Sequence, residues 1–242
     1  MSSLQFSKDQ ESKLQELLRV FLEENKKLNL SAYRTGEQCW VGNILDSIAC
    51  LDILRRVSTR HDTINIIDVG TGGGFPLLPL AILFPEASFT GLDATKKKID
   101  AVQRMVNHLS LSNVQLLIGR AEELGHDPKH REQYDLVLSR ALAELPTLLE
   151  FMSPFCKVKG QMLCWKSLAI DAELLASLEA RMKLHCRMVD HHEYDLDFLV
   201  GEIGLPTSCG GWGRRQILVF EKVKALSKEF PRRTGIPKKE PL

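Results

Sequence analysis

The sequence predicts an α/β fold in which N-terminal helices precede a seven-stranded, mostly parallel sheet. From residue 64 onward, strand-like apolar segments alternate with helical ones, an order typical of parallel strands joined by crossover helices. A run of β-branched residues leads directly into a glycine-rich turn within residues 64–76. A glycine-rich stretch at residues 201–212 precedes the last strand, which we therefore expect to run antiparallel to the others.

The composition is that of an ordinary globular protein. The 242 residues are 44% hydrophobic and 26% charged, enough for one large domain. The net charge is only +1, so a nucleic acid would have to bind through local basic clusters. The first residues lack the apolar core of a signal peptide and contain Asp9 and Glu11, and no apolar run is long enough to cross a membrane. We expect a cytoplasmic protein with no membrane partner.

The six cysteines are scattered along the chain without a C-x-x-C pair. They are Cys39, Cys50, Cys156, Cys164, Cys186 and Cys209. This spacing predicts buried free thiols in a reducing compartment and argues against zinc. We therefore expect no metal site.

Two helices are predicted before the sheet. The first is capped by Ser7 or Asp9, ends near Asn25 and carries leucines along one face. The second is expected over residues 36–57, where the polar Asp46 interrupts an apolar face. We expect both helices to cap the main sheet and not to fold separately.

From residue 64 the expected strands and helices alternate. Strands are expected at residues 64–69, 88–93, 113–119, 134–138, 160–165, 185–193 and 216–223. Helices are expected at residues 77–84, 96–109, 145–152 and 170–183. No internal repeat of solenoid or propeller length is present.

The turn after the first strand, in the sequence INIIDVGTGGGFP, predicts a ligand site. Asp68 ends the strand, and Gly70 and Gly72 let the backbone turn tightly and approach a ligand closely. Backbone N–H groups at the start of the following helix are expected to face the crevice at the carboxyl ends of the strands. Such a crevice suits an anionic or zwitterionic small molecule. A tight turn without any ligand is the alternative.

The spacing of the glycines distinguishes between ligands. A dinucleotide fingerprint requires a third glycine where this chain has Phe75. The pattern G-x-G-x-G with Asp68 two positions earlier instead resembles motif I of class I S-adenosylmethionine-dependent methyltransferases. A nicotinamide-dependent oxidoreductase is the weaker alternative, because no Tyr-Lys or His-Asp catalytic set accompanies the turn. A non-catalytic cofactor- or RNA-binding module also remains open.

Polar residues follow the next three strands. Asp93 lies 23 positions after Gly70, where an acidic residue binds ribose hydroxyls or caps the next helix. Residues after the third strand, beginning with Arg120, are expected to flank an adenine. Arg140 ends the fourth strand and is predicted to point into the crevice. An ion pair with a surface carboxylate is the alternative.

Two basic regions lie near the carboxyl end of the chain. The hairpin loop is expected at the same end of the sheet as the glycine turn, which brings Trp212, Arg214 and Arg215 within reach of a substrate. An aromatic ring beside two arginines suits base stacking and phosphate contacts, although solvated arginines are equally consistent. The tail, residues 228–242, has three prolines that we expect to prevent a helix. A basic extended arm along RNA, or a disordered tail, is expected.

Several segments together resemble the RsmG family, also called GidB, of 16S ribosomal RNA guanine-N7 methyltransferases. They are NLSAYR (residues 29–34), ILDSI (44–48), DVGTGGGFPLLPLAI (68–82), PEASFTGLD (85–93) and SRALAEL (139–145). The terminal PRRTGIPKKEPL is similar to the tail of many members. The resemblance implies the class I methyltransferase (Rossmann-like) fold. We divide the chain into a helical cap at residues 1–62, an S-adenosylmethionine-binding domain at 63–226 and a basic tail at 227–242.

The same resemblance implies S-adenosylmethionine as the cofactor and places its contacts. They fall on Gly70, Phe75, Asp93, Ala94, Thr95, Ala121, Glu122 and Arg140. The turn itself adds Asp68 and Gly72, which we expect to hold the methionine moiety.

The implied substrate is one guanine in the so-called 530 loop of 16S rRNA, free or within the 30S subunit. Guanine N7 already carries an accessible lone pair, so no general base and hence no catalytic acid or base is expected. Catalysis should then consist of positioning, with Arg140 and the basic loop or tail helping to hold RNA. We expect a monomer that binds neither DNA nor a metal.

Overall fold

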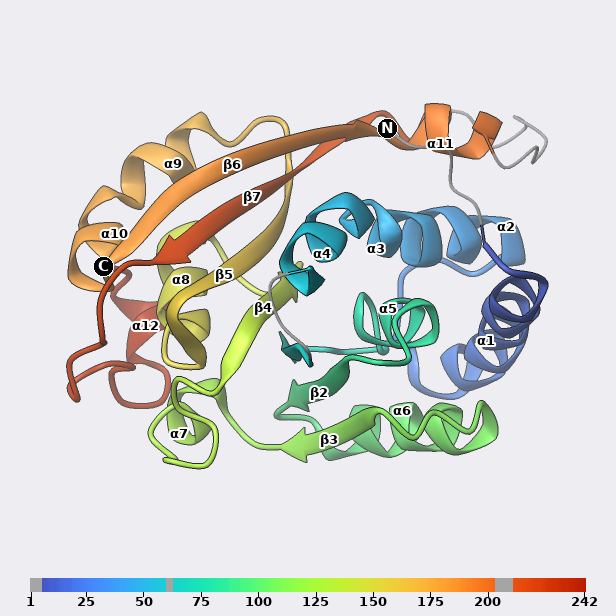
Figure 1. Ribbon diagram of the computed structural model, residues 1–242, viewed down its shortest axis with the longest axis horizontal. Helices are drawn as coiled ribbons and strands as arrows, with labels where there is room; N and C mark the ends of the chain where they lie inside the picture. Colours follow the sequence, from blue (N-terminus) through green and yellow to red (C-terminus); the bar gives the residue numbers. More distant parts are fainter. Residues whose placement is uncertain (1–5, 60–62, 203–210) are drawn as a thin grey trace.

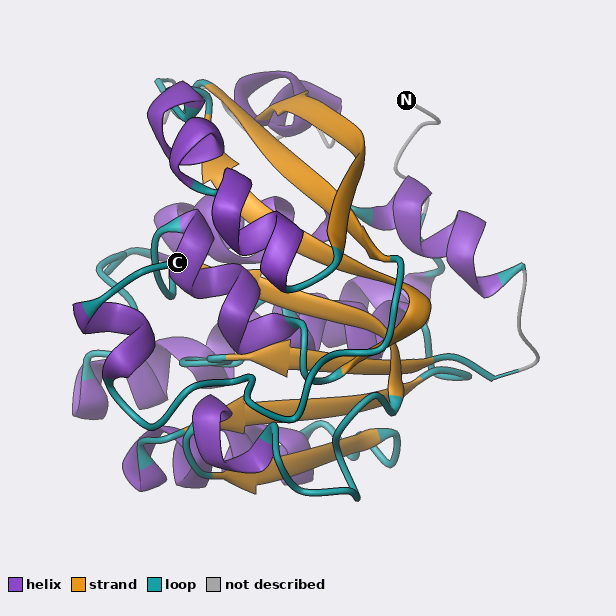
Figure 2. Ribbon diagram, turned by 90° about the vertical axis from the view of Figure 1, so that its left-hand side faces the viewer, coloured by secondary structure: helices purple, strands orange, loops and turns teal. Residues whose placement is uncertain are grey.

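The computed structural model describes residues 6–59, 63–202 and 211–242, which form one seven-stranded sheet with helices on both faces (Figures 1 and 2). The strands are β1 (Asn65–Val69), β2 (Ser88–Asp93), β3 (Val114–Ile118), β4 (Tyr134–Arg140), β5 (Cys156–Ser167), β6 (Cys186–Asp195) and β7 (Arg214–Lys222). Their order is β3-β2-β1-β4-β5-β7-β6. β7 is antiparallel to both of its neighbours, and the pairs from β3 to β5 are parallel, which confirms the predicted topology.

The helices also follow the predicted order. They are α1 (Lys8–Leu28), α2 (Gly36–Cys39), α3 (Asp46–Ile48), α4 (Leu51–Ser58), α5 (Leu77–Leu83), α6 (Lys96–His108), α7 (Ala121–Leu124), α8 (Leu145–Met152), α9 (Asp171–Ala176), α10 (Leu178–Lys183), α11 (Leu196–Glu202) and α12 (Ile236–Lys239), with a π-helical segment, η1 (Trp40–Leu45). Ser7 caps α1 in a capping box with Gln10. This confirms Ser7, one of the two residues that were predicted as the cap.

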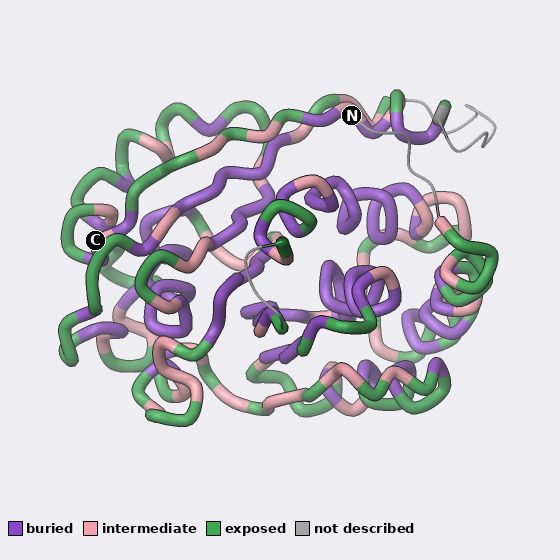
Figure 3. The backbone as a smooth tube through the Cα atoms, in the orientation of Figure 1, coloured by how far each residue is buried: buried purple, intermediate pink, exposed green. Residues whose placement is uncertain are grey.

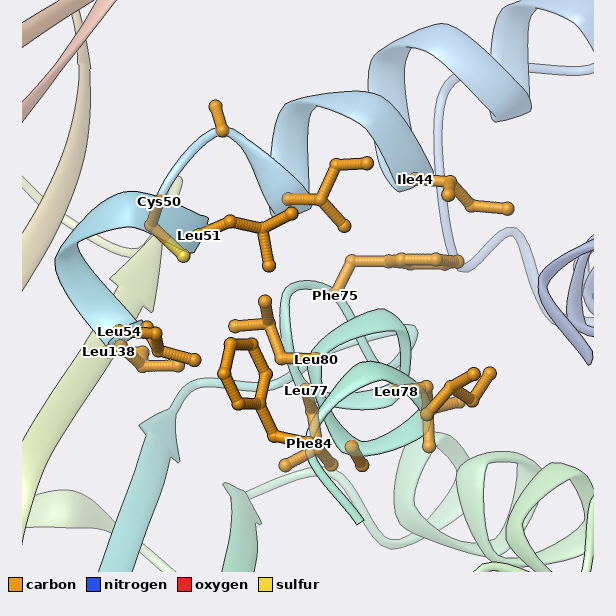
Figure 4. Packing of buried hydrophobic residues seen from close by; sticks show 14 of the residues in the cluster. Ile44, Cys50, Leu51, Leu54, Phe75, Leu77, Leu78, Leu80, Phe84 and Leu138 are labelled. Carbon is orange, nitrogen blue, oxygen red and sulfur yellow. The ribbon is translucent and has the colours of Figure 1, made fainter. Parts of the chain in front are cut away.

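Alternating side chains of the central strands divide the core between the two faces. Ile66 and Leu138 join a cluster with α1, α4, α5 and α6, whereas Ile67 and Val137 join a second cluster with α8 and α10. The central strands and α5 are almost entirely buried (Figure 3). On the first face, side chains of α4 pack against those of α5 (Figure 4). The N-terminal helices therefore complete the core of the sheet.

The predicted helix over residues 36–57 is interrupted. A π-helical segment, η1, follows α2, and a turn at Cys50 separates α3 from α4. Gly42 lies in η1 directly against the ring of Tyr33, so that a Cβ at this position would clash with the ring. Short π-helical segments are frequent at functional sites, and this one directs residues toward the carboxyl ends of the strands.

Two further boundaries differ from the prediction. The expected helix over residues 170–183 is divided at Ser177, whose hydroxyl donates to the carbonyl of Leu174 at 2.8 Å. Helix α11 extends into the predicted loop, of which residues 203–210, with Cys209, lie outside the described residues. The other five cysteines are buried and free, as predicted.

The prediction that prolines prevent a helix in the tail is wrong. Pro237 lies in the first turn of α12, where the N–H that proline lacks would have no partner within the helix. Nor does the tail extend freely, because it packs beside α7 and α8 (Figure 1). The guanidinium of Arg232 donates to the fully buried Glu150, with Nη2 and Oε2 2.7 Å apart.

The described residues contain neither a membrane-spanning helix nor a metal-binding cluster. None of their helices is long and apolar enough to cross a membrane. Nor does this part of the chain bring together three or more His, Cys, Asp or Glu side chains that could hold a metal ion.

Candidate active site

Two adjoining cavities lie at the carboxyl ends of the parallel strands. The larger has a volume of about 790 Å³ and lies between the glycine turn, the N-terminal helices and the start of β7. The smaller, of about 290 Å³, lies between the ends of β2 and β3 and the C-terminal tail. Gly70, Asp93, Lys98 and Leu142 line both. A single elongated ligand can therefore occupy both cavities.

The glycine turn presents bare backbone to the larger cavity. Gly70 has φ +79°, and a Cβ there would lie 2.8 Å from the side chain of Leu142. A Cβ at Gly72 would meet only the carbonyl of Gly70, at 3.8 Å, so space remains open above this residue. Only glycine adopts a positive φ without strain and also leaves the backbone open to a ligand. The spacing of the glycines predicted such a turn.

Asp93 lies where the two cavities meet. One carboxylate oxygen accepts the N–H of Gly72 at 3.0 Å, and the other accepts that of Thr95 at 2.7 Å. Thr95 is the N-cap residue of α6. Asp93 thus secures both the glycine turn and the start of α6, and it lines both cavities.

Asp68 is the exception among the predicted contacts, because it lines neither cavity. Its side chain is fully buried beneath the turn, and burial raises the pKa of this carboxyl to about 7. The Thr71 hydroxyl and the Arg140 guanidinium oppose that shift. Asp68 therefore supports the glycine turn from the protein interior and does not face the ligand site.

Arg140 both lines the larger cavity and forms an ion pair. Its Nη1 donates to the carbonyl of Gly42 at 2.8 Å and to Asp46 Oδ2 at 2.7 Å, and its Nη2 donates to Asn43 Oδ1 at 3.2 Å. Its guanidinium carbon also lies 5.9 Å from the ring centroid of Phe75. The two predicted roles are thus combined, although the carboxylate is buried and not on the surface.

Asp46 is the central residue that sequence reasoning missed. It is buried, and its carboxylate also accepts the Tyr194 hydroxyl at 2.6 Å and lies 3.2 Å from Nη1 of Arg215. Its backbone carbonyl accepts Nε1 of Trp165 at 2.9 Å. Burial and the adjoining carboxylate raise the pKa of Tyr194. The only signal in the sequence was an acidic residue interrupting an apolar helix face.

An aromatic pair stands at the wall of the larger cavity. Tyr33, before α2, and Trp212, before β7, contact each other edge to face with ring centroids 5.2 Å apart. Arg214 and Arg215 line the cavity beside them. The predicted proximity of the hairpin to the glycine turn is confirmed, and Tyr33 is a partner that the sequence analysis did not single out.

The smaller cavity gathers the remaining predicted contacts. Ala94, Thr95, Ala121 and Glu122 line it together with residues of the tail. Glu122 is buried, and its Oε1 accepts the N–H of Gly235 at 3.0 Å. Nine of the ten predicted cofactor contacts thus line one or both of the cavities.

Comparison with known proteins identifies the family. The sequence model of GidB, rRNA small subunit methyltransferase G, matches residues 10–194. This chain belongs to the GidB family. It is 35% identical over 237 residues to the ribosomal RNA small subunit methyltransferase G of Alkaliphilus metalliredigens, covering 96% of this chain and 92% of the relative. Identity to the Streptococcus pneumoniae protein of that name is 34% over 240 residues, covering 99% and 94%.

The fold agrees with this family. A putative sarcosine dimethylglycine methyltransferase from Galdieria sulphuraria superposes with a TM-score of 0.51 at 12% identity, covering 75% of this chain and 86% of that chain. This member of the GidB family has the class I methyltransferase fold and is an rRNA methyltransferase that uses S-adenosylmethionine. Family membership therefore decides against both the oxidoreductase and the non-catalytic module.

Asp46→Asn is expected to destabilise this GidB protein by roughly 3 kcal/mol, because it leaves Arg140 and Arg215 without their buried countercharge. Urea unfolding followed by circular dichroism measures the loss. Asp100→Asn is the matched control, since that carboxylate pairs with Lys96 on the surface and its loss costs under about 1 kcal/mol. An equal loss of unfolding free energy in the two variants would show that the buried ion pairs of Asp46 contribute no more than a surface pair.

Asp68→Asn is expected to change how stability depends on pH. The pKa of Asp68 is raised from 3.8 to about 7 in the folded state, so the folded protein holds a proton that the unfolded chain has lost between these values. Stability of the parent should therefore fall as pH rises from 4 to 7, by at most about 4 kcal/mol. Melting temperatures from pH 4 to 8 test this. A difference between parent and variant that does not vary with pH refutes it.

Proposed function

We propose that this methyltransferase transfers the methyl group of S-adenosylmethionine to N7 of one guanine in the 530 loop of 16S rRNA, acting as a cytoplasmic monomer. The observation that carries the proposal is the continuity of the larger cavity. It runs from the glycine turn to the aromatic pair of Tyr33 and Trp212, with two arginines beside them. A cofactor at one end would thus face an extruded base at the other.

The residues present fit S-adenosylmethionine. The open backbone at Gly70 and Gly72 would hold the methionine moiety, and Asp93 at the junction of the cavities would accept hydrogen bonds from the ribose. Residues of the smaller cavity, among them Ala121, would flank the adenine. Asp68 supports the turn from beneath. When bound, the cofactor supplies an electrophilic methyl group on a positively charged sulfur.

The protein's task in the reaction is to position the base. Guanine N7 attacks through its own lone pair, and no proton has to leave before the new bond forms. We therefore assign no general base, and Asp68, despite its raised pKa, lies outside the cavities. Holding N7 in line with the sulfur–methyl bond can contribute roughly 7–11 kcal/mol.

The aromatic pair suits the charge that the reaction creates. The positive charge leaves the sulfur and appears on the methylated guanine. Aromatic faces attract cations, so Tyr33 and Trp212 would hold the base more strongly as it becomes charged. Lys98, Arg214 and Arg215 line the same cavity and would contact the RNA phosphates around the base.

Transfer of radiolabelled methyl groups to unmodified small subunits tests the reaction. We expect label as 7-methylguanosine at a single position of the 530 loop, mapped by nuclease digestion. Naked 16S rRNA and precursor particles, assayed in parallel, show which form is the substrate. Cofactor binding without transfer to any of these RNAs contradicts the proposal.

Trp212→Ala is expected to lower kcat/KM for rRNA methylation roughly 5- to 100-fold, because base stacking is lost. Trp212→Phe, which keeps an aromatic face, should retain most of the activity. The affinity for S-adenosylhomocysteine should be unchanged in both. Equal activity of the alanine and phenylalanine variants would argue against stacking.

A further inference from the structure

The C-terminal segment, residues 226–242, is fixed at its start by the loop between α7 and β4. The guanidinium of Arg131 donates to the carbonyls of Leu226, Ser227 and Phe230 at 2.8–3.1 Å. The neighbouring Glu132 accepts the N–H of Leu226 at 3.0 Å. These hydrogen bonds dock the start of the segment onto the methyltransferase domain, so the segment is an integral part of the fold and not a free arm.

A second set of contacts fixes the segment to α8. Glu150, fully buried, accepts both the backbone N–H and the guanidinium of Arg232. The buried Thr147 donates its hydroxyl to the carbonyl of Pro237 at 2.8 Å. These contacts lie on either side of residues 233–236 and hold that stretch in one place.

The stretch between these contacts lies over the smaller cavity. Glu122 accepts the N–H of Gly235 at 3.0 Å, and Glu123 accepts the hydroxyl of Thr234 at 3.3 Å. Thr234, Gly235 and Lys238 line the cavity opposite the ends of β2 and β3. The tail therefore provides one wall of the cavity in which the adenosine would lie.

The chemistry of this wall suits a purine nucleoside. An adenine ring offers nitrogen lone pairs as acceptors, and Lys238, which lines the cavity, has an ammonium group that can donate to them. Oε1 of Glu122 already accepts the N–H of Gly235. We therefore assign Glu122 the role of positioning the tail beside the nucleoside. The next residue, Lys239, is also exposed but does not line the cavity.

We propose that the C-terminal segment is the outer wall of the cofactor's adenosine pocket, with Lys238 binding the nucleoside and Glu122, Thr147 and Glu150 positioning the wall. This inference rests on the placement of the cofactor given under Proposed function and deepens it. Docking of the tail and binding of the cofactor are then thermodynamically coupled, so each strengthens the other.

The first test compares Lys238→Ala with Lys239→Ala in the full-length protein. Calorimetric titration with S-adenosylhomocysteine, without RNA, should show affinity roughly 3- to 10-fold weaker for Lys238→Ala and unchanged for Lys239→Ala. The two changes remove the same charge from adjacent positions, so general electrostatics affects both alike. Unchanged affinity in Lys238→Ala, or equal weakening in both variants, overturns the proposal.

Asp93→Ala separates this proposal from the placement on which it rests. If Asp93→Ala weakens binding and Lys238→Ala does not, the cofactor lies as proposed and the tail is not its wall. If neither variant weakens binding, the placement itself fails. If Lys238→Ala weakens only the binding of rRNA, the segment is an RNA contact and the proposal is overturned.

The coupling is tested through Thr147, which does not line the cavity. Thr147→Val keeps the shape of the side chain and removes the hydroxyl that holds Pro237. We expect faster amide hydrogen exchange in residues 233–239 and weaker S-adenosylhomocysteine binding. In the parent protein, S-adenosylhomocysteine should slow exchange in the same residues. Exchange there that does not respond to S-adenosylhomocysteine refutes the coupling.

Discussion

One buried carboxylate joins the N-terminal helices to the sheet. Asp46 accepts Arg140 at the end of β4, Tyr194 at the end of β6 and Arg215 at the start of β7. Its backbone carbonyl accepts the indole of Trp165 from β5. Two cations and a phenol around a single anion form a network in which the loss of one member leaves the others buried and unpaired. The positions of four strand ends relative to the helical cap depend on this cluster.

The proposed transfer to guanine N7 suits a site of this kind. Methylation of a nitrogen that already carries a lone pair needs a rigid frame and little acid–base chemistry. The frame here consists of exposed backbone at Gly70 and Gly72, apolar and aromatic walls, and charged groups already paired with one another. Asp68 is a buried carboxyl with a raised pKa, so the turn includes a group that is unfavourable when ionised in the folded state.

Local sequence signals predicted local structure well. The capping residue Ser7, the bounds of β2 at residues 88–93 and the glycine turn were all predicted correctly from residue types and spacings within short stretches of the chain. The predictions were wrong where distant partners intervene. The helix expected over residues 36–57 is interrupted at η1, where Gly42 meets Tyr33 and Arg140, and the tail forms α12 because α8 holds it in place.

The sequence by itself determined the α/β topology, the reversed last strand and the turn with Asp93, because periodicity and glycine spacing act over short distances. Only the tertiary structure decided which groups complete the site. Asp46 meets Arg140 across 94 positions and Tyr194 across 148, and Glu122 meets Gly235 across 113. Such pairs leave no periodic trace in a single sequence. They exist because parallel strands bring their carboxyl ends to one edge, where residues far apart in the chain must satisfy one another's charges.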